Sequence, residues 1–146
     1  MPYSITLSRK KLDIPEANLS SPKAVHDFAQ KHVLKKKDSW RESCHLLTFD
    51  KGKYVKGIFL MSLGTEHSTT IDPSLAARVA IMDGASAVVL VHTHPAASPA
   101  PSAADIKQTD RLRKTLAAVG VSLIDHVIIS DDSFFSFSEE KITKTN

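Results

Sequence analysis

The sequence predicts an α/β fold in which a mixed β-sheet lies between two layers of helices, an α-β-α arrangement. Short apolar, β-branched runs alternate along the chain with longer stretches that carry helix caps and helical periodicity. One of these runs, 87–91, is apolar throughout, which is typical of a strand buried on both faces. At 146 residues the chain is long enough for one domain that buries about two-thirds of its surface.

The first elements follow from caps and turns. Residues 1–20 are expected to form an N-terminal arm ahead of one domain at 21–140. Ser21-Pro22 predicts a helix start, because a hydroxyl cap is followed by a residue with a fixed backbone angle. Its apolar face comprises Val25, Phe28, Ala29 and Val33. Strands are predicted at 42–49 and 54–63, joined as a hairpin by the turn Asp50-Lys51-Gly52-Lys53.

The second helix and the buried strand come next. Asp72-Pro73 predicts a helix start, and Gly84 predicts its end. The apolar residues that this helix carries are Leu75, Val79 and Met82. The strand at 87–91 then leads into the histidines, and Pro95 ends it.

A third helix and a strand pair complete the domain. The helix is predicted to run from Ser102 to Gly120. Its packing residues are Ile106, Leu112, Leu116 and Val119. Strands at 123–130 and 134–138 are predicted to pair through a turn at Asp131-Asp132. Residues 141–146 are expected to form a polar tail.

The motif that carries chemistry follows the buried strand. His92 and His94 are two residues apart, so they point to the same side of a strand. Ser102 opens a helix and brings Asp105 back on its first turn. Two imidazoles and one carboxylate leave one tetrahedral position for water, as in catalytic zinc sites. We therefore expect one divalent metal, with Zn(II) as the first candidate.

Each half of this motif has a structural alternative. A histidine at a strand end is more often a hydrogen-bonded structural residue than a ligand, and Ser102-x-x-Asp105 alone is a capping box. The combination, with a strand before it and a helix after it, favours the metal site. A cap and a ligand can also coexist, since the first turn of a helix can face a site.

The motif resembles a known family. The stretch H-T-H-P-x5-P-S-x-x-D from His92 to Asp105 matches the H-x-H-x7-S-x2-D signature of JAMM (MPN+) metalloproteases. Residues 85–92 and 121–129 resemble the JAB domain of the bacterial RadC family, and the resemblance extends over 40–138. It implies a JAB/MPN fold, which is cytidine-deaminase-like, and a zinc-dependent hydrolase that cleaves a peptide or isopeptide bond.

The resemblance also implies residue roles. Glu42 aligns with the family's upstream glutamate, the general base that takes a proton from the activated water and returns it to the leaving amine. Glu66 is a rival by its position beside His67, but it does not fall on that alignment position. Ser102 is implied as a donor to the oxyanion of the tetrahedral intermediate. The implied residues around the site are Thr93, Asp125 and His126.

This chain differs from the usual RadC sequence at two places in the motif. Thr93 stands where RadC proteins usually have Asn, and Ala96-Ala97 stands where they have Ser-Gly. These changes spare the proposed ligands and bear on the substrate groove. Full-length RadC proteins also carry a helix-hairpin-helix region ahead of the JAB domain, and the expectation here is a stand-alone domain without it. A DNA-binding role that depends on that region is therefore in doubt.

A deaminase can be rejected. Zinc nucleoside deaminases need H-x-E and P-C-x-x-C, whereas this chain has one cysteine and no glutamate two residues after either motif histidine. Cys44 alone supports no disulfide framework and is expected to be a buried structural thiol. The remaining histidines, His26, His32, His45 and His67, are assigned to structure or surface.

The expected partner is a peptide or protein substrate whose identity the sequence does not name. Net charge is +3, and its basic clusters at 9–11 and 35–37 are typical of solvated segments. Nucleic-acid association, as in DNA repair, is therefore the weaker alternative, and a non-hydrolytic MPN-type interaction module is the other. Without a membrane-spanning or signal segment, and with one cysteine, the expected compartment is the cytoplasm.

Overall fold

One mixed five-stranded sheet organises the chain, in the order β2-β1-β3-β4-β5. The structure is a computed structural model that describes residues 1–4 and 6–140, so the predicted tail at 141–146 lies outside the described residues. The strands are β1 (Ser43–Phe49), β2 (Val55–Leu63), β3 (Ala87–Thr93), β4 (Ser122–Ile129) and β5 (Phe134–Ser136). Strands β3 and β4 are parallel, whereas the other neighbouring pairs are antiparallel.

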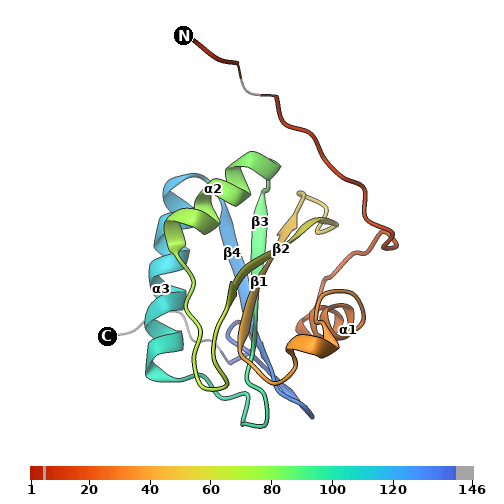
Figure 1. The fold of residues 1–146 in the computed structure, drawn as a ribbon, viewed down its shortest axis with the longest axis vertical. Coiled ribbons are helices and arrows are strands. Elements are labelled where there is room, and N and C mark those ends of the chain that lie inside the picture. The colour runs from red at the N-terminus through yellow and green to blue at the C-terminus, as the bar shows by residue number, and fades with distance from the viewer. Residues whose placement is uncertain (5, 141–146) are drawn as a thin grey trace.

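Helices cover both faces of this sheet. Helix α1 (Pro22–His32) covers one face, and α2 (Pro73–Asp83) and α3 (Ala103–Ala118) cover the other (Figure 1). We call these the α1 face and the α2/α3 face. A short 3-10 helix, η1 (Lys36–Asp38), follows α1. The predicted α-β-α layering is confirmed. None of the described helices combines the length and apolar character that crossing a bilayer requires.

The central strand β3 shows how the two cores form. Val89 and Val91 pack in the core under α1, while Val88 and Leu90 pack in the core under α2 and α3. Successive side chains of a strand point to opposite faces, so an unbroken apolar run is needed where both faces are covered. The same alternation decides which face each later residue of β3 meets.

The predicted helix starts are confirmed by their caps. The Ser21 hydroxyl accepts the Ala24 N–H at 3.1 Å, and the Asp72 carboxylate accepts the Ser74 N–H at 2.9 Å. Both caps satisfy N–H groups that have no partner within a helix. Gly84 ends α2 with a left-handed φ of 66°, a conformation that glycine adopts without strain.

Two predicted packing faces need correction. Helix α2 packs through Ala76, Ala77 and Ala80, whereas Leu75 and Met82 are 41% and 59% exposed. Both stripes have helical spacing, but small alanine side chains let the helix lie closer to the sheet and to α3. In α3, Leu112 and Leu116 are fully buried as expected, Ile106 is half-buried, and Val119 is 42% exposed because it lies past the last turn of the helix.

The N-terminal arm is fixed at two points. Apart from a single bridge between Asn18 and Tyr54, the described part of residues 1–20 contains no helix or strand. Arg9 forms an ion pair of 2.9 Å with the buried Asp83 at the end of α2. The Thr48 hydroxyl also donates to this carboxylate, at 2.5 Å. The arm is therefore extended, and it is held against the domain at residue 9 and again near residue 18.

Candidate metal centre

The two motif histidines lie at the C-terminal end of β3, on the α2/α3 face. His92 occupies the same side of the strand as Val88 and Leu90, and its backbone is paired with Cys44 of β1. His94 follows two residues later, and its N–H donates to the Ile129 carbonyl oxygen at 2.8 Å. The prediction that the two histidines point to the same side of the strand is confirmed, since their rings contact edge to face with centroids 4.7 Å apart.

Glu42 reaches the same place from β1. It immediately precedes the strand, and its backbone is held by the loop that follows β2. The Glu42 N–H donates to the Thr65 carbonyl oxygen, and the Gly64 N–H donates to the Glu42 carbonyl oxygen, both at 2.8 Å. A side chain at Gly64 would bring its Cβ within 1.8 Å of the Ser68 carbonyl oxygen, so the loop needs glycine there.

Helix α3 supplies the second carboxylate through its cap. The Ser102 hydroxyl accepts the Asp105 N–H at 3.0 Å, and the Asp105 Oδ2 accepts the Ser102 N–H at 2.8 Å. This reciprocal capping box fixes the rotamer of Asp105 and turns its carboxylate toward the histidines. The cap and the site thus use the same residue, as the sequence allowed.

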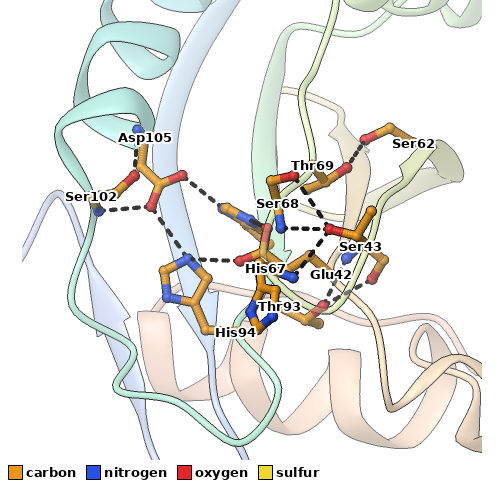
Figure 2. Close-up of polar contacts among 12 residues, drawn as sticks. Glu42, Ser43, Ser62, His67, Ser68, Thr69, Thr93, His94, Ser102 and Asp105 are labelled. Atoms are coloured by element: carbon orange, nitrogen blue, oxygen red, sulfur yellow. Dashed lines mark hydrogen bonds and ion pairs between the residues drawn. The ribbon is translucent and has the colours of Figure 1, made fainter.

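Four buried side chains meet at this point, and Figure 2 labels Glu42, His94 and Asp105 among them. His94 Nε2 lies 3.2 Å from Asp105 Oδ2, and His92 Nδ1 lies 3.5 Å from Asp105 Oδ1. Glu42 is slightly farther, at 3.8 Å from His92 Nε2 and 3.7 Å from His94 Nε2. Each of these side chains is at most 8% exposed as a residue. Such a cluster desolvates two carboxylates without a lysine or arginine in any of these contacts.

The donor set suits a divalent cation. Ligand atoms of Glu42, His92 and His94 all lie within 4.8 Å of one another, so these residues could hold a metal ion. The buried His92 Nε2 has no hydrogen-bond partner among the described residues. Zinc–ligand bonds of ~2.0–2.1 Å place tetrahedral ligand atoms about 3.3 Å apart. The contacts of Asp105 are closer to this value than those of Glu42, but Asp105 contacts the Nδ1 atom of His92, whereas Glu42 contacts the Nε2 atom of both rings.

Hydrogen bonds orient the ring of His94. Its Nδ1 lies 2.9 Å from the Ser98 carbonyl oxygen and donates to it, which turns Nε2 toward the two carboxylates. Metal-binding histidines are commonly oriented by such a bond at the other ring nitrogen. The hydrogen bond with Asp105 raises the pKa of His94. Burial alone would raise the pKa of Asp105, but hydrogen bonds from His94 and Ser102 outweigh it and hold that pKa well below its ordinary value.

His126 supports the site from behind. Its ring stacks on His92 with centroids 5.6 Å apart and on Phe137 at 4.5 Å. Its Nδ1 lies 2.6 Å from the Thr109 hydroxyl, which donates to the Asp105 carbonyl oxygen at 2.6 Å. The Thr109 hydroxyl proton is used in that bond, so His126 must be the donor at Nδ1. Complete burial lowers the pKa of His126 well below its ordinary value, which keeps the ring neutral.

Two residues that were expected around the site, Asp125 and Thr93, lie on the α1 face of the sheet. Asp125 does not reach the metal cluster; its carboxylate accepts the Ser136 hydroxyl at 2.6 Å and the Ser138 N–H at 3.0 Å, and so holds β5. Thr93 also points away from the histidines. Its hydroxyl accepts the Ser43 N–H at 2.9 Å and donates to the Arg41 carbonyl oxygen at 3.5 Å. Thr93 therefore holds the backbone on both sides of Glu42.

The positions of Glu66 and Cys44 can be compared with the roles considered for them from the sequence. Glu66 is exposed on the loop after β2 and is not among the residues that could share a metal. Cys44 is 2% exposed, and burial raises the pKa of its thiol to about 12. This environment is that of an inert buried thiol, as expected.

Comparisons with known proteins agree with the motif. The family model described as RadC-like JAB domain matches residues 19–142. A UPF0758 protein of Thermotoga maritima is 37% identical over 134 residues, which are 92% of this chain and 58% of that protein. UPF0758 proteins of Pseudomonas fluorescens and Aeromonas hydrophila are 36% and 33% identical over 121 residues, 83% of this chain and 53% of each relative. The chain thus spans little more than half the length of these relatives, whose names state no activity.

Proposed function

Because the chain belongs to the RadC-like JAB domain family, we propose that it is a metal-dependent hydrolase of JAMM type that cleaves a peptide or isopeptide bond. One observation carries the proposal: two imidazoles and two carboxylates from three separate segments converge in a buried cluster. Burying two carboxylates together is unfavourable unless they are paired or coordinate a cation. A structural role alone does not account for this arrangement.

The family motif is the basis on which we assign distinct roles to the two carboxylates. Asp105, 3.2 and 3.5 Å from nitrogens of the imidazoles, is assigned as the ligand together with His92 and His94. Glu42, 3.7 and 3.8 Å from the Nε2 atoms of the same rings, has its ligand atom within 4.8 Å of theirs and is assigned as the base beside the metal. Zn(II), when bound, would polarise the amide carbonyl and lower the pKa of a water molecule toward ~7. Glu42 then takes a proton from the water and delivers it to the leaving amine.

The hydroxyl proton of Ser102 is not used in the helix cap. In the cap its oxygen acts as the acceptor of the Asp105 N–H, so its own O–H is available to a substrate. Ser102 is exposed, which gives the substrate access to it. We assign it to the oxyanion that develops as the amide is attacked. Loss of one such donor typically lowers turnover by about 100- to 1000-fold.

Elemental analysis of the purified protein tests the proposal. We expect about one divalent metal per chain in the wild type, as in mononuclear sites of this ligand type. The double variant His92→Ala, His94→Ala should contain none. His67→Ala is the matched control, because His67 is exposed on the loop beside Glu42 and should not affect loading. Nickel or cobalt would also satisfy the prediction, since N/O ligands accept them. Equal metal content in the wild type and the double variant would contradict the assignment of His92 and His94 as metal ligands.

A further inference from the structure

A cavity of about 650 Å³ lies on the α1 face of the sheet. Its volume falls within the range of ~300–1000 Å³ that is common for small-molecule sites. Its wall includes Ser43 and His45 of β1 and Thr93 at the end of β3. These residues alternate with Glu42, Cys44, His92 and His94, which face the other side. The cavity and the candidate metal centre are therefore back to back, separated by the thickness of one sheet.

His45 gives this cavity an unused hydrogen-bonding group. The residue is 8% exposed, and its Nδ1 has no hydrogen-bond partner among the described residues. A buried polar atom without a partner is unfavourable, and such atoms are usually satisfied by protein, water or a ligand. Burial, with Lys35 nearby, lowers the pKa of His45, so the ring is neutral and offers one donor and one acceptor.

The rest of the lining combines an apolar wall with charges of both signs. Leu34, Ile58 and Leu60 supply apolar surface. The charged lining residues are Lys35, Lys36, Asp38 and Asp131. The lysines follow α1, whereas Asp131 lies in the turn between β4 and β5, where its Oδ2 accepts the Ala96 N–H at 3.2 Å. Because Asp38 shares η1 with Lys36 while Asp131 comes from a different segment, the wall offers charges of both signs to a ligand that carries one group of each sign.

We propose that this cavity binds a short apolar peptide with free termini. The peptide carboxylate is recognised by Lys35 and Lys36, and its ammonium by Asp131, with Asp38 as a second acidic group. Its apolar side chains pack on Leu34 and Leu60, and His45 bonds to a backbone amide. Amphipathic carboxylates without an ammonium would leave the two aspartates unmatched. The inference goes beyond the proposed hydrolysis and does not depend on it.

The test is a titration with the tripeptide Leu-Ala-Leu, followed by backbone amide chemical shifts. It is performed on the full-length Glu42→Gln protein, so that hydrolysis of the probe cannot interfere. We expect saturable shifts at Ser43, His45 and Thr93. N-acetylation or C-amidation of the probe should each weaken binding by about fivefold, the scale of one lost exposed charge pair. Ser-Ala-Ser should bind more weakly still, because it lacks the apolar side chains.

Matched variants locate the charges. Lys35→Glu should weaken binding of the free-carboxylate peptide, whereas Lys37→Glu, which does not line the cavity, should not. Asp131→Asn should weaken binding of the free-amine peptide, whereas Asp132→Asn should not. Lys35 and Lys37 lie at the start of and within η1, Asp131 and Asp132 lie in the turn after β4, and all four are exposed, so the variants are expected to fold.

Three outcomes would overturn the proposal. The first is the absence of saturable shifts at the lining residues. The second is equal binding of the blocked and free peptides, which would indicate an apolar pocket without charge recognition. The third is confinement of the shifts to His92, His94 and Ser102, which would place the peptide at the metal centre instead. None of these outcomes bears on metal loading, so this proposal and the proposed hydrolysis can fail separately.

Discussion

His94 and His45 are equally buried, each 8% exposed, yet their pKa values shift in opposite directions. His94 lies on the α2/α3 face beside Asp105, and the hydrogen bond to that carboxylate raises its pKa. His45 lies on the α1 face without a carboxylate partner, and burial lowers its pKa. The comparison shows that a carboxylate partner can outweigh the effect of burial on the pKa of an imidazole.

The same contrast separates the two faces near the ends of β1 and β3. On the α2/α3 face, polar groups contact one another at 3.2–3.8 Å and form a closed cluster suited to a small cation. On the α1 face, polar groups surround an open cavity of about 650 Å³ and leave His45 Nδ1 unpaired. Alternate residues of the same two strands thus face the candidate metal centre on one side and the cavity on the other.

The largest effect of a single substitution is expected at Glu42, on the α2/α3 face. Glu42→Gln should keep the metal and the fold, because the amide is nearly isosteric and Glu42 is proposed as the base and not as a ligand. Hydrolysis of a cleavable peptide or isopeptide substrate should fall by ~100-fold or more, the scale of general-base removal. Glu66→Gln is the control and should change turnover little. If Glu66→Gln abolishes turnover while Glu42→Gln leaves it intact, the glutamate has been misplaced.

Substitutions at Thr93 test whether a residue on the α1 face affects the candidate metal centre on the α2/α3 face. Thr93→Val removes the hydroxyl that accepts the Ser43 N–H, and the free energy of unfolding should fall by about 1–3 kcal/mol. Thr93→Ser keeps the hydroxyl and should cost less. Turnover should follow the same order, because Thr93 holds the backbone around Glu42. Urea denaturation and initial rates of both variants provide the measurement; equal behaviour of the two would contradict this role.

The pH dependence of stability should show both types of histidine at once. In metal-free protein, His94 has a raised folded pKa, so its contribution is full below pH 6.5 and is lost as the pH rises through that folded pKa. His126 and His45 have lowered folded pKa values, so stability is lost as the pH falls below 6.5 and the unfolded chain takes up protons there.

These opposing effects predict a maximum of stability between pH 6.5 and the raised folded pKa of His94. Thermal melts of chelator-treated protein between pH 5 and 8.5, on the order of the window that histidines titrate in, would reveal it. Asp105→Asn should remove the decline on the alkaline side, because His94 then loses the partner that raises its pKa. A steady rise in stability through pH 8 in the wild type would contradict the assignment of His94.

The smallest effect is expected on the outer side of the α2/α3 layer. Met82→Lys should change the free energy of unfolding by no more than about 0.5 kcal/mol, since Met82 is 59% exposed. Ala80→Leu on the inner side should destabilise by about 1–3 kcal/mol, because a larger side chain has no space against the sheet. Chemical denaturation of both variants tests the corrected packing face. Similar losses of stability in the two variants would instead support the packing face predicted from the sequence, which includes Met82.

Local patterns in the sequence were enough for part of the site. Strand parity correctly placed His92 and His94 on one side, and the capping pattern placed Ser102 and Asp105 together. Both arguments use only neighbouring residues and the geometry of one element. Glu42 required the family resemblance, because nothing local distinguishes it from other carboxylates in a charged stretch.

Contacts between distant segments could not be predicted in this way. The bond from Ser43 to Thr93 joins residues fifty positions apart, and it depends on the pairing register of β1 and β3. Thr109 and Ser98 support the site only because α3 and the preceding loop return to it. In α2, two stripes had suitable spacing, and only the proximity of the sheet and α3 favoured the alanines.

The alternation along β3 also limits how this domain can change in length. Inserting one residue within Ala87–Val91 would turn His92 and His94 toward the α1 face and Thr93 toward α3, because a strand has a period of two. Both sites would be lost together, although no ligand had been substituted. Related chains are therefore expected to keep β1 and β3 constant in length, together with the seven-residue loop at 95–101 that the spacing between His94 and Ser102 requires.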